Sequence, residues 1–136
     1  MFAFERLEAW RHCHALTLAL YRTTRGWPKG ELYGLVSQVR RAAVSVEANI
    51  AEGVAKRGQA EFRRFLDFSL GSLSEVACLL RIALDLGYLS QDQADEIEPL
   101  RASASRLTWR LYQGVSKQAK EGASSRRKGT LLKPTD

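Results

Sequence analysis

Apolar residues recur every three or four positions along most of the 136-residue chain, and short stretches marked by glycine and proline separate these segments. Because that spacing puts side chains on one face of an α-helix, the pattern predicts four amphipathic helices and no strand. The helices are expected to run from about Glu5 to Arg25, Glu31 to Ala55, Gln59 to Leu86, and Ser90 to Lys117. Short turns between long helices favour an all-α fold, an up-down-up-down antiparallel four-helix bundle.

Each predicted helix has one stripe of mainly apolar residues that is expected to face the core. The stripes are Leu7, Trp10, His14, Leu18 and Tyr21 in the first helix; Leu35, Val39, Ala42, Val46, Ile50 and Gly53 in the second; Phe62, Phe65, Leu66, Ser69, Leu73, Val76, Leu80 and Leu84 in the third; and Ile97, Leu100, Ala104, Leu107, Leu111 and Val115 in the fourth. Cys13 and Cys78 also fall at apolar helical positions, where a free cysteine packs as a small hydrophobic side chain.

Residues with special backbone behaviour mark the predicted helix ends. Gly26 and Gly87 are expected to end the first and third helices, Gly26 through a left-handed conformation. Ser90 and Gln93 have the spacing of a capping box at the start of the fourth helix. Pro99 is expected either to kink that helix or to begin a new one.

A single bundle domain is expected over residues 1–117, followed by a basic flexible tail over 118–136, because the apolar period disappears after about Gln118. No apolar run reaches the roughly 18 residues that a membrane-spanning helix needs. The N-terminus lacks the basic region, apolar stretch and cleavage site of a secretory signal, so we expect a cytoplasmic location.

Polar residues border the apolar face of the second predicted helix at spacings of seven, four and three: Gln38, Ser45, Asn49 and Glu52. One interpretation is structural: Asn49 and Glu52 form hydrogen bonds across a helix interface and fix its register, with partners among Arg40, Arg41 and Arg57. The other is functional: they line a groove that binds a partner.

A second set of apolar or small residues lies outside the core stripes of the second and third helices: Val44, Ala48, Ala51, Ala55, Phe68, Leu79, Ile82 and Leu86. Contiguous apolar surface of this kind commonly marks a protein interface, so these residues are predicted to contact a neighbouring subunit. The alternative is that the alanines simply favour helix formation and that loops or the tail cover the rest.

The chain is basic, with a formal net charge of +6 and a sequence pI of about 9.7. Half of that excess lies in the last 19 residues. Basic residues of the second and third helices are predicted to contact nucleic-acid phosphates: Arg40, Arg41, Lys56, Arg57, Arg63 and Arg64. The alternative is that they are only solvated.

Candidate metal and catalytic groups are few. His12 and His14 flank Cys13, but residues two apart on a helix point about 200° apart, so they cannot close on one ion. No glycine-rich phosphate loop, nucleophile elbow or paired carboxylate motif is present. We therefore expect no metal, no cofactor and no enzymatic activity.

Two stretches are distinctive: WPKGELYGLVSQVRRAAVSVEANIAEG at 27–53, and EFRRFLDFSLGSLSEV at 61–76 with LGYL after it. They resemble the four-helix bundle proteins encoded in intervening sequences of bacterial 23S ribosomal RNA genes, over roughly Phe4 to Leu111. Gly58 departs from the family, which often has a serine cap there. The resemblance implies a ring of five subunits. The chain also has a more distant resemblance to accessory proteins of diversity-generating retroelements, which bind a reverse transcriptase.

Together these features predict a non-enzymatic homo-oligomeric bundle, a pentamer by resemblance, that binds RNA or other nucleic acid through basic surfaces. The alternative is an adaptor that docks a partner protein, such as a reverse transcriptase, on the groove bordered by Gln38, Asn49 and Glu52.

Overall fold

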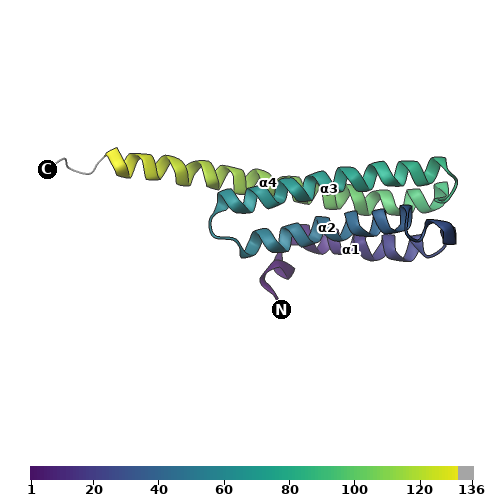
Figure 1. The fold of residues 1–136 in the computed structure, drawn as a ribbon. Coiled ribbons are helices and arrows are strands. Elements are labelled where there is room, and N and C mark those ends of the chain that lie inside the picture. The colour runs from purple at the N-terminus through teal and green to yellow at the C-terminus, as the bar shows by residue number, and fades with distance from the viewer. Residues whose placement is uncertain (132–136) are drawn as a thin grey trace.

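Four α-helices make up most of residues 1–131, the part of the chain that the computed structural model describes, and this part contains no strand. They are α1 (Glu8–Thr24), α2 (Leu35–Ala55), α3 (Gln59–Asp85) and α4 (Gln91–Leu131) (Figure 1). Two short 3₁₀ helices, η1 (Ala3–Arg6) and η2 (Lys29–Glu31), precede α1 and α2. The all-α class is therefore confirmed.

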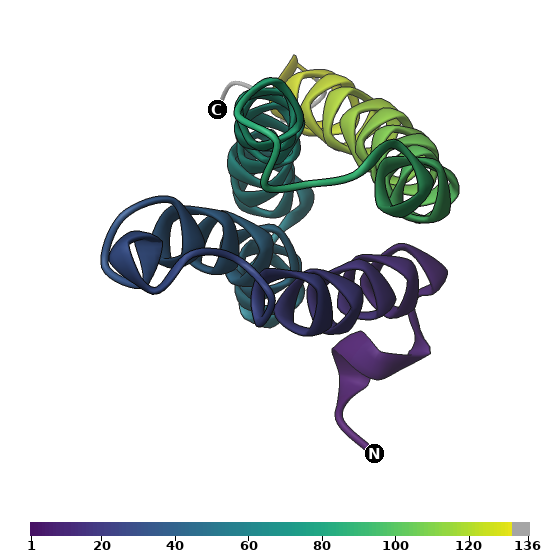
Figure 2. The ribbon, with the colours of Figure 1, turned by 90° about the vertical axis from the view of Figure 1, so that its right-hand side faces the viewer.

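Consecutive helices run in opposite directions, and each helix packs against two others. In the end view, α1 and α2 form one layer and α3 and α4 form the other (Figure 2). The contacts close a cycle from α1 to α2, α3, α4 and back to α1. This is the arrangement of an antiparallel four-helix bundle.

Three of the four predicted core stripes lie in the core. All six stripe residues of α2 are buried, and the stripes of α3 and α4 are buried or half-buried against the same cluster. The stripe predicted for the first helix is right only at Leu7 and Trp10, which pack against the core cluster. It is wrong at its other positions, because Leu18 and Tyr21 are exposed and the His14 side chain is 43% exposed. The buried residues of α1 are Ala9, Cys13, Leu16, Thr17, Leu20 and Thr24.

Backbone hydrogen bonding explains how α1 buries two threonines. The Thr24 hydroxyl donates to the carbonyl oxygen of Leu20 at 2.8 Å, and the Thr17 hydroxyl donates to the carbonyl oxygen of Cys13 at 3.1 Å. A hydroxyl that donates to its own helix loses little on burial, so α1 turns a face towards the core that the apolar pattern did not indicate.

The two cysteines have opposite environments. Cys13 is buried, as predicted, and loss of hydration raises the pKa of its thiol to about 11. Cys78 is exposed, so the prediction that it packs in the core is wrong. At neutral pH the Cys13 thiol is protonated and serves as a small apolar group.

The helix ends agree with the sequence in part. Ser90 and Gln93 form the predicted capping box, with reciprocal hydrogen bonds of 3.0 and 3.1 Å, and Gly87 has a left-handed φ of +79° after α3. Gly26 is not left-handed, so that prediction is wrong. The second helix begins later than expected, at Leu35, whose N–H donates to the Glu31 carboxylate at 2.9 Å.

Helix α4 is longer than the sequence pattern indicates. It passes through Pro99 without interruption and continues to Leu131, so the predicted end near Lys117 is wrong. Residues 118–131 lack an apolar stripe but contain good helix formers, and they extend a helix that the bundle has already nucleated. Residues 132–136 of the predicted tail lie outside the described part, and the division into domain and tail stays a prediction.

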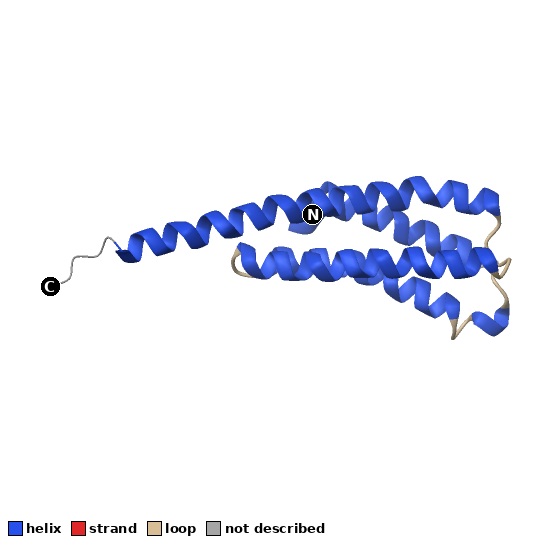
Figure 3. Ribbon diagram, turned by 90° about the horizontal axis from the view of Figure 1, so that it is seen from above, coloured by secondary structure: helices blue, strands red, loops and turns tan. Residues whose placement is uncertain are grey.

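Figures 1 and 3 show that the end of α4 projects past the turn between α2 and α3. In the described part of the chain, none of the helices combines the length and apolar character needed to cross a membrane.

Gly53 marks a close approach between α2 and α3. A Cβ atom at this position would lie 3.0 Å from Phe62 Cδ1 and 3.1 Å from Phe65 Cβ. Glycine at this buried position therefore lets the two aromatic residues of α3 pack directly on the α2 backbone.

We predict that Gly53→Leu lowers the free energy of unfolding by about 1–3 kcal/mol, because the added side chain overpacks this contact. Urea denaturation followed by circular dichroism measures the change. Gly114→Leu is the control, since a Cβ there meets no atom within 4 Å, and it should leave the midpoint unchanged or raise it. Equal midpoints for the two variants would contradict the close-packing explanation.

Candidate interaction surfaces

The predicted polar residues of α2 lie along its contact with α3. The hydroxyls of Ser45 and Ser72 are hydrogen-bonded at 2.9 Å, and the Asn49 amide donates to the carbonyl and hydroxyl oxygens of Ser45 at 2.8 and 3.1 Å. The Ser69 hydroxyl donates to the Val46 carbonyl at 2.8 Å and is fully buried. Ser45 thus bonds across the α2–α3 interface, whereas Asn49 bonds to Ser45 within α2 and not across the interface as predicted.

The other two residues of the predicted polar edge do not join this network. Gln38 and Glu52 are exposed, and Asn49 bonds to its own helix rather than to an arginine, so the predicted arginine partners are wrong. Gln38 instead lines an open groove with Arg41, Ala42, Ser45 and Glu75. Ser45 therefore belongs both to the helix contact and to the lining of this groove, and Glu52 is exposed and belongs to neither.

The six predicted nucleic-acid contacts divide into two groups. Arg40 and Arg41 lie in the first half of α2, and Lys56, Arg57, Arg63 and Arg64 lie around the turn between α2 and α3. Lys56 follows Arg40 by sixteen positions, a distance of about 24 Å along the helix axis. These residues therefore do not form one patch on a single chain.

Arg40 is held by the end of α1. Its Nε donates to the Thr24 hydroxyl at 3.0 Å, and its guanidinium lies 4.6 Å from the centre of the Tyr21 ring. Both contacts restrict the side chain, so Arg40 joins α2 to α1 and is less available to phosphate than its charge indicates.

The turn group is arranged around two aromatic rings. Lys56 Nζ lies 5.2 Å from the centre of the Phe65 ring, and the Arg64 guanidinium lies 5.2 and 5.6 Å from the rings of Phe65 and Phe68. Arg64 also pairs with Glu61 at 3.3 Å, but both side chains are about half exposed, so the pair contributes little. Cations of this group remain at the surface, at the end from which α4 projects (Figure 1).

Most of the predicted subunit-interface residues are at the surface of the single chain. Phe68 and Ile82 on α3 are 47% and 41% exposed, Leu86 directly after α3 is 57% exposed, and Val44 on α2 is 41% exposed. Ala48 and Ala55 are exposed and Ala51 is half-buried. Leu79 differs, because it is 6% exposed and belongs to the core, so it is not available to a second chain.

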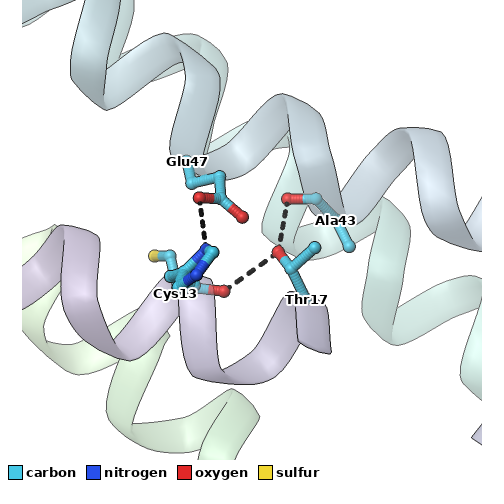
Figure 4. Close-up of polar contacts among 5 residues, drawn as sticks. Cys13, Thr17, Ala43 and Glu47 are labelled. Carbon is cyan, nitrogen blue, oxygen red and sulfur yellow. Dashed lines mark hydrogen bonds and ion pairs between the residues drawn. The ribbon is translucent and has the colours of Figure 1, made fainter. Parts of the chain in front are cut away.

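Polar contacts between α1 and its neighbours were not predicted (Figure 4). His14 Nδ1 lies 2.9 Å from the Glu47 carboxylate, and the Thr17 hydroxyl lies 3.3 Å from the Ala43 carbonyl oxygen on α2. The Cys13 sulfur lies 3.5 Å from the Thr108 hydroxyl on α4. The available signal was the pair Thr17 and Thr24, seven apart in α1, because a threonine in a helix either faces solvent or bonds its hydroxyl to a nearby carbonyl oxygen.

Among residues 1–131, no three His, Cys, Asp or Glu side chains are grouped so that they could share a metal ion. His12 and His14 have different surroundings: the His14 ring stacks on Trp10 at 4.7 Å between ring centres and pairs with Glu47. The geometry of His14 is thus that of a residue that packs on Trp10 and is hydrogen-bonded to Glu47.

We predict that the Ser45 and Ser72 hydroxyls are energetically coupled. A double-mutant cycle with Ser45→Ala and Ser72→Ala should give a coupling of about 0.5–1.5 kcal/mol in the free energy of unfolding. Ser74→Ala, at an exposed position of α3, is the control partner and should add independently to Ser45→Ala. Additivity in the Ser45 and Ser72 pair as well would show that this bond does not stabilise the contact.

Comparison with known proteins places this bundle in a family. The family model described as 23S rRNA-intervening sequence protein matches residues 5–110, which include α1, α2, α3 and the first half of α4. A search of curated proteins gave no match. The match confirms the resemblance carried by the two distinctive stretches, and the chain belongs to the 23S rRNA-intervening sequence protein family.

Proposed function

We propose that this protein is a non-enzymatic homo-oligomeric bundle, a ring of five subunits, that presents basic surfaces to RNA or another nucleic acid. The observation that carries the assembly part is the outer surface of α2 and α3. There Val44, Phe68, Ile82 and Leu86 are exposed although each is large and apolar.

The outward side of α2 supports self-association further. Its residues, spaced by four, three and four positions, are all uncharged: Val44, Ala48, Ala51 and Ala55. Small uncharged residues let a second helix approach closely, whereas a solvated helix usually carries charged residues on its outward side. Because most soluble oligomers are symmetric assemblies of one chain, a second copy of this chain is the partner expected to cover this surface.

The nucleic-acid part of the proposal is supported by charge and by family. The chain has a formal net charge of +6, and the turn group places four cations at one end of the bundle. A ring would repeat those cations around its axis and multiply the phosphate contacts. The family takes its description from intervening sequences of 23S rRNA, which makes RNA the first nucleic acid to test.

The groove beside α2 supports a second candidate function, docking of a partner protein. It is lined by Gln38, Arg41, Ala42, Ser45 and Glu75, so it offers one cation, one carboxylate and two neutral polar groups. That mixture suits a polar protein surface better than a polyanion. Capture of a defined partner that persists at high salt and is abolished by Gln38→Ala would favour this candidate.

We predict that Ile82→Glu with Leu86→Glu disrupts self-association, raising the dissociation constant of the oligomer at least about tenfold. Sedimentation equilibrium at micromolar concentration measures the mass. The control is Ala60→Glu with Ser74→Glu, which adds the same charge at exposed positions of α3 outside this apolar set.

The assembly proposal requires that the control keeps the mass of the unmodified protein. A monomer for the unmodified protein, or an identical mass for all three proteins, would contradict it.

A further inference from the structure

The net positive charge of the protein is concentrated in one part of one helix. Residues 1–101 contain 13 Lys and Arg and 13 Asp and Glu, so that part is neutral. Residues 102–131 contain seven basic residues and a single acidic residue, Glu121. The whole net charge of +6 therefore lies on the last thirty residues of α4.

Basic residues near a helix C-terminus stabilise the helix through its dipole, but that effect is confined to about the last turn. Here the basic residues begin at Arg106, some seven turns before Leu131. Within the described part of the chain, the four basic side chains from Arg106 to Lys120 form no ion pair with an acidic side chain. Helix stabilisation does not account for them.

These residues share one side of α4. Positions at spacings of three, four, four, three and seven lie on a single helix face and are all exposed: Arg106, Trp109, Gln113, Lys117, Lys120 and Arg127. We call this set the α4 outer face. The opposite side of the same helix holds Ile97, Ala104 and Val115 in the bundle core.

An aromatic pair belongs to this surface. Trp109 is 49% exposed, and its ring stacks on that of Tyr112 with 5.5 Å between ring centres and 18° between planes. Tyr112 is half-buried and packs against the core cluster, so it supports the indole from one side. A supported and exposed indole between cations is the arrangement on which nucleic-acid bases stack.

We propose that the α4 outer face is a binding site for single-stranded nucleic acid, in which Trp109 stacks on a base and Arg106, Lys117 and Lys120 contact phosphates. This proposal rests on the proposed nucleic-acid binding and assigns it to residues other than the predicted basic ones. An acidic protein would match the cations without needing the ring, whereas a single strand uses both. Most of the α4 outer face lies beyond residue 110, where the family match ends.

The test measures the affinity of the full-length chain for a short labelled single-stranded RNA of mixed sequence by fluorescence anisotropy, over a series of salt concentrations. Single-stranded DNA of the same sequence forms the second arm and tells whether the ribose matters. Heparin forms a third arm, because it carries negative charge without bases.

Trp109→Ala should weaken RNA binding about tenfold, Trp109→Phe should keep most of it, and neither should change heparin binding. Arg106→Gln with Lys117→Gln should reduce the slope of log affinity against log salt by about 1.4. Arg22→Gln with Arg25→Gln removes the same charge from exposed positions at the C-terminal end of α1 and should leave the slope unchanged. Circular dichroism and sedimentation confirm that each variant keeps its fold and mass.

The outcomes separate the site from the function. RNA binding that Trp109→Ala leaves intact, or equal slopes for the two double variants, would overturn the site on α4 while nucleic-acid binding stands. No binding of the unmodified protein to RNA or DNA at low salt would overturn the proposed nucleic-acid binding and the site together.

Discussion

The contact between α2 and α3 is the constraint on which the rest of this bundle depends. Gly53 lets Phe62 and Phe65 approach the α2 backbone, and two buried or half-buried serine contacts continue the interface along its length. Small side chains are required there, because any larger residue must either separate the helices or leave its rotamer. With α2 and α3 held in this way, α1 and α4 each pack against one member of the pair and close the bundle.

This arrangement gives the four helices different surfaces. The outward sides of α2 and α3 contain exposed apolar residues such as Phe68 and Leu86, which suit contact with a second copy of the chain. The outer face of α4 is basic and aromatic, and its helix projects past the bundle (Figure 3). The proposed self-association and the proposed nucleic-acid binding thus use different helices, so we expect that one can be altered without the other.

The sequence predicted the helices and three core stripes because apolar spacing is a local property. It failed at side chains whose polar contacts decide their burial: the Thr17 and Thr24 hydroxyls donate to carbonyl oxygens one turn earlier in α1, and Arg40 is held by Tyr21 of that helix. The continuation of α4 to Leu131 was missed because an apolar stripe is not needed to extend an existing helix. The grouping of charge was visible in the sequence, but only the continuation of α4 past Lys117 placed Lys120 and Arg127 on the same face as Trp109.

The central claim is that a neutral bundle carries its nucleic-acid contacts on α4, and cross-linking tests it most directly. Ultraviolet cross-linking of the full-length protein to single-stranded RNA, followed by mass spectrometry of the linked peptides, locates the contact without any substitution. The account predicts that the linked peptides fall within residues 102–131 and include Trp109 or Tyr112. Cross-links confined to the turn group between Lys56 and Arg64 would contradict it.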